Sequence, residues 1–92
     1  MNKGALSARV YGVVQGVSFR YYTRRKATAL QLIGWVRNLP NGSVEVWAEG
    51  ERGKLDELVE WLHHGPDFAR VERVDVDWET PHEKYTSFEV TY

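Results

Sequence analysis

Hydrophobic and polar residues alternate along several short stretches of this chain, which is the period of a half-buried β-strand. Residues 5–14 place Leu6, Ala8 and Val10 on one face and polar residues on the other. The same alternation predicts further strands over residues 34–38, 43–49, 73–78 and 88–92, with Gly50 ending the third of the five. An Asn41-Gly42 pair between the second and third strands predicts a tight hairpin turn.

Apolar residues recur at helical spacing over residues 19–30 and 55–62, which predicts a helix from about 20 to 31 and a second one ended by Gly65-Pro66. The expected order is therefore β-α-β-β-α-β with a short fifth strand. Each helix has one apolar stripe, so both helices must cover the same face of an antiparallel sheet. Right-handed crossovers then favour a ferredoxin-like open sandwich of the α+β class.

The length of 92 residues fits one domain, residues 1–92, and the composition of 42% hydrophobic and 27% charged residues argues against disorder. The absence of cysteine excludes disulfide frameworks, thiolate metal sites and cysteine nucleophiles. No apolar run approaches the ~20 residues of a membrane span, and the N-terminus lacks the apolar segment of a signal peptide. We expect a cytoplasmic protein that does not associate with membranes.

Charge is distributed unevenly along the chain. Residues 1–40 contain seven cationic and no acidic side chains, whereas residues 41–92 contain five cations and thirteen acids. An anion site is therefore expected in the first half, unless folding interleaves the two halves and averages the field. The loop 15–20 is the strongest candidate, because Gly16 and the start of a helix can offer backbone N–H groups, and Arg20 can offer a two-pronged donor. The alternative is an ordinary loop whose arginine is simply solvated.

Other polar residues give weaker signals. Asn38 ends the second strand and could orient a water molecule, although an asparagine at this place more often serves the turn. His63, His64 and His82 lie in the second half, away from the basic loop, and Asp75 and Asp77 fit the solvated side of an edge strand. These patterns predict neither a metal site nor a Ser-His-Asp arrangement.

Several segments resemble, in order and in spacing, the acylphosphatase family. They are Gly12-Val13-Val14-Gln15-Gly16-Val17-Ser18-Phe19-Arg20, Gly34-Trp35-Val36-Arg37-Asn38, Asn41-Gly42-Ser43-Val44-Glu45, Trp61-Leu62, Gly65-Pro66, Ala69-Arg70-Val71 and Phe88-Glu89-Val90. The resemblance covers essentially the whole chain, and the first two segments together are highly specific to the family.

The resemblance implies a ferredoxin-like sandwich that hydrolyses the carboxyl-phosphate anhydride bond of acyl phosphates without metal, cofactor or covalent intermediate. It places the catalytic arginine at Arg20 and the catalytic asparagine at Asn38. The phosphate-binding loop falls on Gln15, Gly16, Val17, Ser18, Phe19 and Arg20. It also implies a monomer that takes a small acyl phosphate as substrate, with inorganic phosphate or sulfate as a competing anion and no nucleic-acid partner.

One departure and two alternatives bear on this interpretation. Gln31 stands where family members commonly have glycine, and a left-handed conformation there would cost roughly 1 kcal/mol. An RNA-binding domain shares the element order and could stack bases on Tyr11 and Trp47, but Glu45 and Glu49 share that face. A module that binds a phosphate-bearing ligand without hydrolysing it is the second alternative, and turnover of a simple acyl phosphate distinguishes it.

Overall fold

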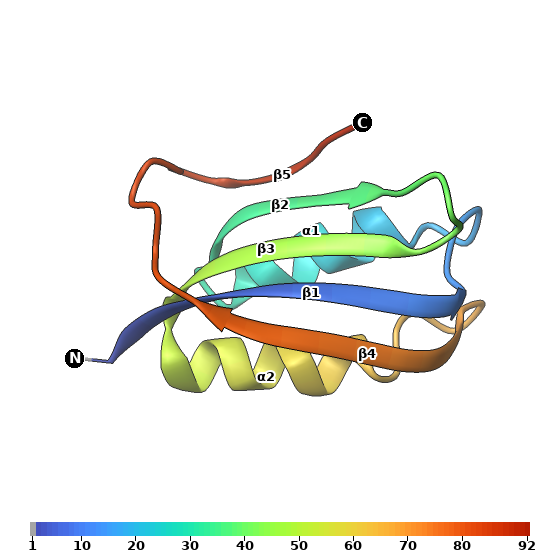
Figure 1. Cartoon of the computed structure of the whole chain (residues 1–92), viewed down its shortest axis with the longest axis horizontal. Helices are drawn as coiled ribbons and strands as arrows, with labels where there is room; N and C mark the ends of the chain where they lie inside the picture. Colours follow the sequence, from blue (N-terminus) through green and yellow to red (C-terminus); the bar gives the residue numbers. More distant parts are fainter. Residues whose placement is uncertain (1) are drawn as a thin grey trace.

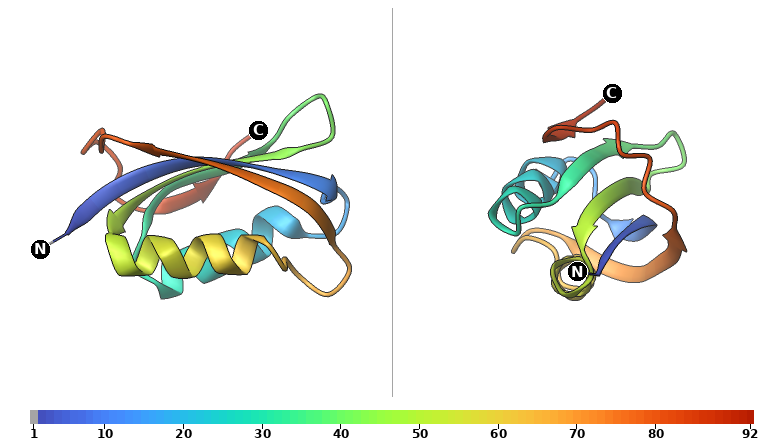
Figure 2. Two further views of the ribbon diagram at one scale, coloured as in Figure 1. Left: turned by 60° about the horizontal axis from the view of Figure 1, so that its bottom comes forward. Right: turned by 90° about the vertical axis from the view of Figure 1, so that its left-hand side faces the viewer.

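A computed structural model, which describes residues 2–92, shows a five-stranded sheet covered on one face by two helices. The elements are β1 (Lys3–Val13), α1 (Phe19–Ala29), β2 (Ile33–Asn38), β3 (Val44–Glu51), α2 (Arg52–Leu62), β4 (Arg70–Glu79) and β5 (Phe88–Val90). The strands lie in the order β4-β1-β3-β2-β5 (Figure 1). Figure 2 shows both helices below the sheet in its left-hand view. The expected ferredoxin-like α+β sandwich is confirmed.

The sheet is mixed rather than wholly antiparallel, so that part of the expectation was wrong. β1 pairs antiparallel with β3 and β4, and β2 pairs antiparallel with β3. β5, however, runs parallel to β2, with Gly34 opposite Phe88 and Val36 opposite Val90. The physical reason is that the connection from β4 crosses the sheet before β5 begins, so β5 reaches the far edge in the same direction as β2 (Figure 1).

The third strand continues through Gly50 to Glu51, where the sequence pattern predicted that it would end. Gly50 remains paired with Gly4 of β1. A Cβ at position 50 would come within 2.6 Å of Leu32 Cδ2. Glycine is therefore favoured there by the close packing of the segment after α1, and it does not interrupt the strand.

The core lies between the sheet and the two helices and matches the predicted faces. The stripe of α1 is buried at Phe19, Thr23, Ala27 and Leu30, and that of α2 at Leu55, Leu58 and Leu62. The sheet contributes Leu6, Ala8, Val10, Val36, Val44, Val46 and Ala48. Removing this apolar surface from water is the main stabilising contribution, and it fixes the register of every strand that faces the helices.

No helix within residues 2–92 has the length and apolar composition needed to cross a bilayer.

Helix α1 ends in a left-handed turn at Gln31, whose φ is 62°. The N–H of Leu32 donates to the carbonyl of Ala27 at 2.9 Å, and the N–H of Gln31 donates to that of Thr28 at 3.0 Å. This pair of hydrogen bonds defines a Schellman motif, in which glycine is the preferred residue at the left-handed position. The left-handed conformation suggested by the family's usual glycine is thus present, with an exposed glutamine in its place.

A second special feature lies on the open face of the sheet, where Glu49 is buried with 3% of its surface exposed. Its carboxylate accepts hydrogen bonds from Trp47 Nε1 at 2.7 Å and from the backbone N–H groups of His82 at 2.9 Å and Glu83 at 3.2 Å. The His82 ring stacks on Trp47 with centroids 4.2 Å apart. These contacts attach the connection between β4 and β5 to the sheet.

Replacing Gln31 with glycine is expected to stabilise the fold by about 0.5–1 kcal/mol, because glycine adopts the left-handed conformation without a Cβ clash. For a domain of this size the gain corresponds to roughly 4 °C in Tm. Thermal unfolding followed by circular dichroism measures it. The matched control is Gln31→Ala, which retains the Cβ and should give no gain; equal Tm values for both variants would contradict the explanation.

The hydrogen bonds to Glu49 also make stability depend on pH. Burial alone would raise the pKa of this carboxyl, but the hydrogen bonds from Trp47, His82 and Glu83 and the nearby His82 ring outweigh it and lower the pKa below the ordinary 4.5. A lowered pKa in the folded state adds stability that is present above the unfolded value and disappears as pH falls through the folded one.

The variant Glu49→Gln is therefore expected to lose about 2 kcal/mol at neutral pH, because the amide cannot accept three charge-assisted hydrogen bonds. The difference from the unchanged protein should shrink as pH falls below about 4.5. Urea denaturation between pH 7 and pH 3 measures both effects. The exposed Glu57→Gln serves as control and should change stability little at any pH; a pH-independent penalty for Glu49→Gln would contradict the linkage.

Candidate active site

The sheet register brings two segments that are distant in sequence to one edge of the molecule. β3 lies between β1 and β2 and pairs antiparallel with both, so β1 and β2 run in the same direction and end at the same edge. Val10 of β1 and Asn38 of β2 both pair with Val44 of β3. The loop 15–20, which follows β1, therefore begins close to the strand end that presents Asn38.

Gln15 fixes this loop to the β2–β3 hairpin. Its side-chain Nε2 donates hydrogen bonds to the carbonyl oxygens of Leu39 and Ser43, both at 2.8 Å. The hairpin itself is closed by the N–H of Leu39 donating to the Ser43 carbonyl at 2.9 Å. Gln15, which was predicted as part of the phosphate-binding loop, thus connects this loop to the end of β2, where Asn38 lies.

The loop backbone is unusually bent before α1. Gly16 has φ 76° and Ser18, the N-cap residue, has φ 61°. A non-glycine residue in this region costs about 1 kcal/mol or more, and such strain is concentrated where backbone N–H groups are presented to a ligand. Ser18 makes no side-chain capping bond, and the first turn of α1 contains no acidic residue. The free N–H groups of the helix start therefore remain available to an anion.

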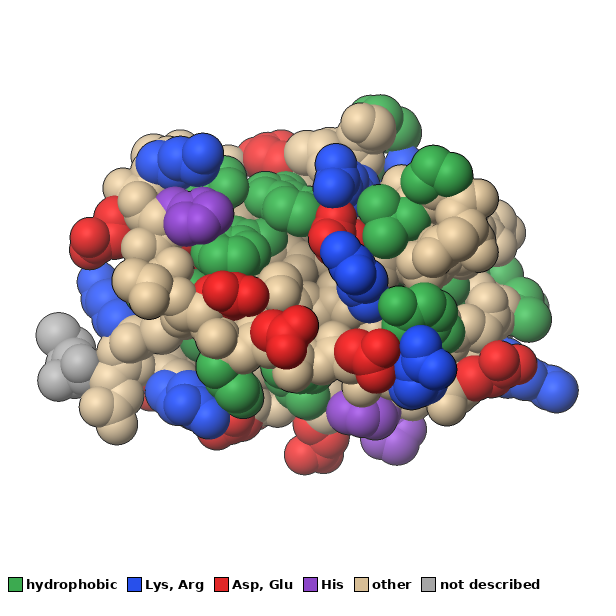
Figure 3. All heavy atoms as spheres, in the orientation of Figure 1, with side chains coloured by type: hydrophobic (Ala, Val, Ile, Leu, Met, Phe, Trp, Pro, Cys, Tyr) green, Lys and Arg blue, Asp and Glu red, His purple; other side chains and the backbone are tan. Residues whose placement is uncertain are grey.

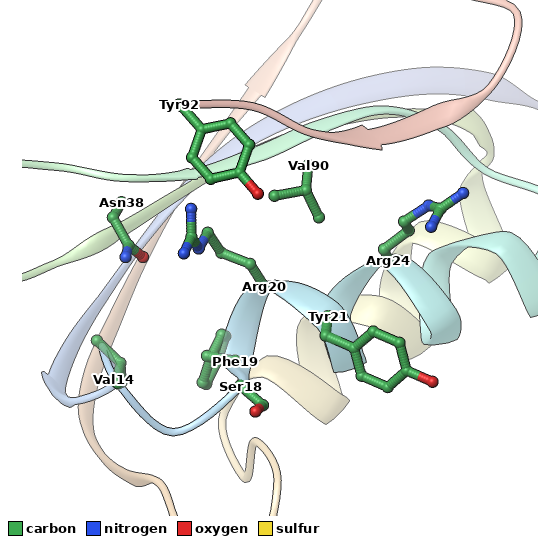
Figure 4. Close-up of a pocket in the computed structure, with 10 residues that line it drawn as sticks. Val14, Ser18, Phe19, Arg20, Tyr21, Arg24, Asn38, Val90 and Tyr92 are labelled. Atoms are coloured by element: carbon green, nitrogen blue, oxygen red, sulfur yellow. The ribbon is translucent and has the colours of Figure 1, made fainter.

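A pocket of about 550 Å³ opens beside this loop. Figure 4 shows Arg20 in its centre, with Asn38 to one side and Tyr92 above. The Arg20 guanidinium lies 4.9 Å from the centroid of the Tyr92 ring. The pocket is lined by Val14, Gly16, Ser18, Phe19, Arg20, Tyr21, Arg24, Asn38, Val90 and Tyr92. Arg20, Asn38 and most of the predicted loop are thus brought together in a single cavity.

Not every predicted loop residue faces this cavity. Neither Gln15 nor Val17 belongs to its lining. Val17 packs against the hydrophobic core, and Gln15 is directed to the hairpin. Phe19 lines the cavity but is 1% exposed, and its ring lies 5.6 Å from that of Trp61 on α2, so it mainly anchors the start of α1.

Asn38 carries an unusual atom. Its side-chain Oδ1 is buried and accepts no hydrogen bond from any residue in the range 2–92. Leaving a buried acceptor unpaired costs about 1–3 kcal/mol, so native structures rarely keep one without a reason. Asn38 also belongs to the pocket lining, so the residue that carries this acceptor stands in the wall of the cavity.

The chemistry of the lining favours an anion. It contains two guanidinium groups, on Arg20 and Arg24, and no acidic, histidine or lysine side chain. Within the described part of the chain, no group of three or more histidine, cysteine or acidic side chains is arranged to hold a metal ion. His63 and His64 are exposed at the end of α2, and His82 stacks on Trp47, so the fold brings none of the three histidines to the pocket.

The open face of the sheet does not resemble a base-stacking surface. Trp47 is covered by His82 and only 9% exposed, and Tyr11 lies under the Arg73 guanidinium at 4.2 Å. Figure 3 shows basic and acidic side chains interleaved over this face. Glu45, for example, forms ion pairs with both Arg9 at 3.3 Å and Arg37 at 2.7 Å. Asp75 lies on the edge strand β4, as predicted.

Sequence reasoning missed Arg24 and Tyr92 as pocket residues. Arg24 follows Arg20 by four positions in α1, which places both on one side of the helix, so the spacing could have revealed it. Tyr92 reaches the pocket only because β5 pairs with β2, a pairing that has no local sequence signal.

Comparison with known proteins agrees with this arrangement. An acylphosphatase from Acaryochloris marina is 54% identical over 85 residues, covering 92% of this chain and 90% of that protein. A solved acylphosphatase from Coxiella burnetii superimposes with a TM-score of 0.93 at 44% identity, over 98% of this chain and 94% of the other. The acylphosphatase from Bacillus subtilis gives the same TM-score at 35% identity, over 97% and 99% of the two chains.

The family model for acylphosphatase matches residues 6–90, which includes the loop 15–20, Arg20 and Asn38. Sequence, fold and pocket therefore agree over nearly the whole chain, and this protein belongs to the acylphosphatase family.

Proposed function

We propose that this protein hydrolyses the carboxyl-phosphate anhydride bond of acyl phosphates by direct attack of water, with Arg20, the loop 15–20 and Asn38 as the acting groups. Membership of the acylphosphatase family supports the reaction, and the pocket supports the residue roles. The observation that carries the mechanism is that Asn38, whose buried Oδ1 has no hydrogen-bond partner among residues 2–92, lines the same cavity as Arg20.

Arg20 and the loop bind the phosphoryl group in this proposal. The guanidinium offers two parallel N–H donors that match two phosphoryl oxygens. The bent loop before α1 and the positive end of the helix dipole supply further N–H groups. In the transition state negative charge spreads over the equatorial phosphoryl oxygens, so donors fixed around them lower the barrier without a change of shape.

Asn38 positions the attacking water. Its Oδ1 accepts a hydrogen bond from the water and turns an oxygen lone pair toward phosphorus, which replaces a bimolecular encounter by a held geometry. An amide is not a base at neutral pH, so its role is orientation. In the protein without substrate, leaving Oδ1 without a hydrogen bond lowers stability, and in this proposal that loss keeps the acceptor available for the water.

The bond changes require no further protein group. Water oxygen bonds to phosphorus, and the bond from phosphorus to the acyl oxygen breaks with its electron pair leaving on the carboxylate. The corresponding acid has a pKa near ~4, so the leaving group departs without a proton. The lining has no acidic or histidine side chain to serve as a base, and in this proposal the proton of the attacking water passes to a phosphoryl oxygen.

We further propose that the enzyme acts as a cytoplasmic monomer without metal or cofactor, and that inorganic phosphate and sulfate compete with the substrate for the loop. Interleaved charges on the open face support the expectation that nucleic acid is not a partner, because a nucleic-acid surface requires a continuous basic patch.

Hydrolysis of benzoyl phosphate in the presence of a chelator tests the reaction. Turnover that survives the chelator supports metal-free hydrolysis. A folded protein that binds phosphate but shows no turnover would instead indicate a module that binds phosphate-bearing ligands, and strong salt-dependent binding of single-stranded RNA would favour the RNA-binding alternative.

Replacing Asn38 with alanine should lower kcat by roughly 100-fold or more, because the water loses its fixed position, while phosphate inhibition changes little. The variant should lose at most ~1 kcal/mol of stability, because the oxygen that is removed has no hydrogen-bond partner among residues 2–92. Steady-state kinetics and urea denaturation measure the two effects. Near-full kcat in this variant would refute the water-positioning role.

Asn41→Ala is the matched control for Asn38. Asn41 lies in the same hairpin, and its Oδ1 accepts hydrogen bonds from Ser43 N at 3.0 Å and Ser43 Oγ at 2.5 Å. Its removal should lower stability by about 1 kcal/mol and leave most of the turnover. The two asparagines should therefore show opposite patterns in activity and stability.

Arg20→Lys should weaken both substrate use and phosphate inhibition by about 100-fold, because an ammonium group cannot reproduce the two-pronged contact. The conservative control is Arg25→Lys, since Arg25 is exposed, lies 5.9 Å from the Tyr21 ring and is outside the pocket lining. Inhibition constants for inorganic phosphate, measured alongside kcat/KM, show whether anion binding is lost. Comparable losses in both variants would contradict a special role for Arg20.

A further inference from the structure

In-line displacement gives the pocket a direction. The attacking water and the leaving oxygen occupy opposite sides of phosphorus in such a reaction. Figure 4 shows Asn38 on one side of Arg20 and Val90 and Arg24 on the other. If Asn38 holds the water, the carboxylate leaves away from Asn38, and the acyl group is directed toward Val90 and Arg24.

The sheet register indicates how far Arg24 lies from Asn38 in this direction. Arg24 Nε donates to the carbonyl of Phe88 at 3.2 Å, and Phe88 is opposite Gly34 on β2. Gly34 precedes Asn38 by four residues, which corresponds to about 13 Å along an extended strand. Along α1, Arg24 follows Arg20 by four residues, or about 6 Å. Arg24 therefore lies at the end of the pocket that is remote from Asn38.

One hydrogen bond fixes the guanidinium of Arg24 and leaves its other N–H donors available. Its Nε is committed to the Phe88 carbonyl, and among residues 2–92 no hydrogen bond or ion pair engages its two terminal nitrogens. Fixing Nε restricts a long side chain that would otherwise move freely, which reduces the entropy lost when the terminal nitrogens bind a ligand. The terminal nitrogens present the fork geometry that matches a carboxylate or phosphate.

The pocket also has room and charge for more than one anionic group. Its volume of about 550 Å³ is within the range of sites that enclose ligands much larger than a phosphoryl group. Its lining carries Arg20 and Arg24 and no acidic side chain. One phosphoryl group bound at Arg20 leaves Arg24 without an ion pair among residues 2–92, although Glu89 lines a neighbouring cavity with it. The basic character of residues 1–40 thus exceeds what binding a single phosphoryl group requires.

We propose that Arg24 forms a second anion subsite that selects acyl phosphates whose acyl group carries a further negative group, such as a carboxylate or a second phosphate. The proposal rests on the function proposed above, because it uses the orientation of substrate between Asn38 and Arg24. Arg24 acts as a specificity-determining residue: it contacts the remote end of the acyl group and takes no part in breaking the anhydride bond.

A pair of matched substrates tests the subsite. Benzoyl phosphate and 4-carboxybenzoyl phosphate share the head group and the rigid ring, and differ by one remote carboxylate. The unchanged protein should use 4-carboxybenzoyl phosphate with a kcat/KM about fivefold higher, the size expected for one partly solvated ion pair. Arg24→Gln should bring the ratio of the two kcat/KM values back to about one.

Arg25→Gln is the control for overall charge. It removes the same charge one position away, from an exposed residue outside the pocket lining, and should leave the preference intact. Equal ratios in the unchanged protein and in Arg24→Gln, or an equal loss in Arg25→Gln, would overturn the subsite. Lack of any hydrolysis of benzoyl phosphate would instead contradict the proposed function, and the subsite with it.

A second measurement uses only the unchanged protein, in case Arg24→Gln does not fold. Benzene-1,4-dicarboxylate and benzoate are compared as inhibitors of benzoyl phosphate hydrolysis. The dicarboxylate should inhibit about fivefold more strongly. Equal inhibition by the two carboxylates would also overturn the proposal.

Discussion

The site depends on one constraint of the sheet, which is that β3 lies between β1 and β2 and is antiparallel to both. Through Val44 this arrangement aligns Val10 with Asn38 across three strands. The loop that follows β1 and the last residue of β2 must then meet at one edge. Gln15 donates two hydrogen bonds to the hairpin, which connect the loop to the strand end that carries Asn38.

The sparse chemistry of the pocket is consistent with a reaction whose leaving group is already a good one. A carboxylate needs no protonation, and charge on the phosphoryl oxygens can be met by fixed N–H donors and a guanidinium. An acidic side chain in the lining would repel the dianionic substrate, and the lining has none. The acidic residues of this chain lie elsewhere: Glu45 pairs with Arg9 and Arg37 on the open face, while Glu49 holds the β4–β5 connection.

Some local costs lie at the site, and the core offsets them. Ser18 is held at a positive φ, and the Asn38 oxygen is buried without a partner. Each feature costs on the order of 1–3 kcal/mol, which is a large fraction of the stability of a small domain. Both lie beside well-packed residues such as Phe19 and Val44, whose burial keeps the strained backbone in place. Gln31 is a different case, because its left-handed turn belongs to the end of α1 and serves the fold alone.

The sequence by itself determined the element order, the buried faces of both helices and the identity of the candidate site residues. These depend on local periodicity, as at Phe19, Thr23 and Ala27, and on motifs that can be read without neighbours, as at Arg20 and Asn38. Only the tertiary structure decided the parallel pairing of β5, the continuation of β3 through Gly50 and the entry of Tyr92 into the pocket. The physical reason is that each of these features depends on contacts between residues far apart in sequence, which local sequence propensity does not describe.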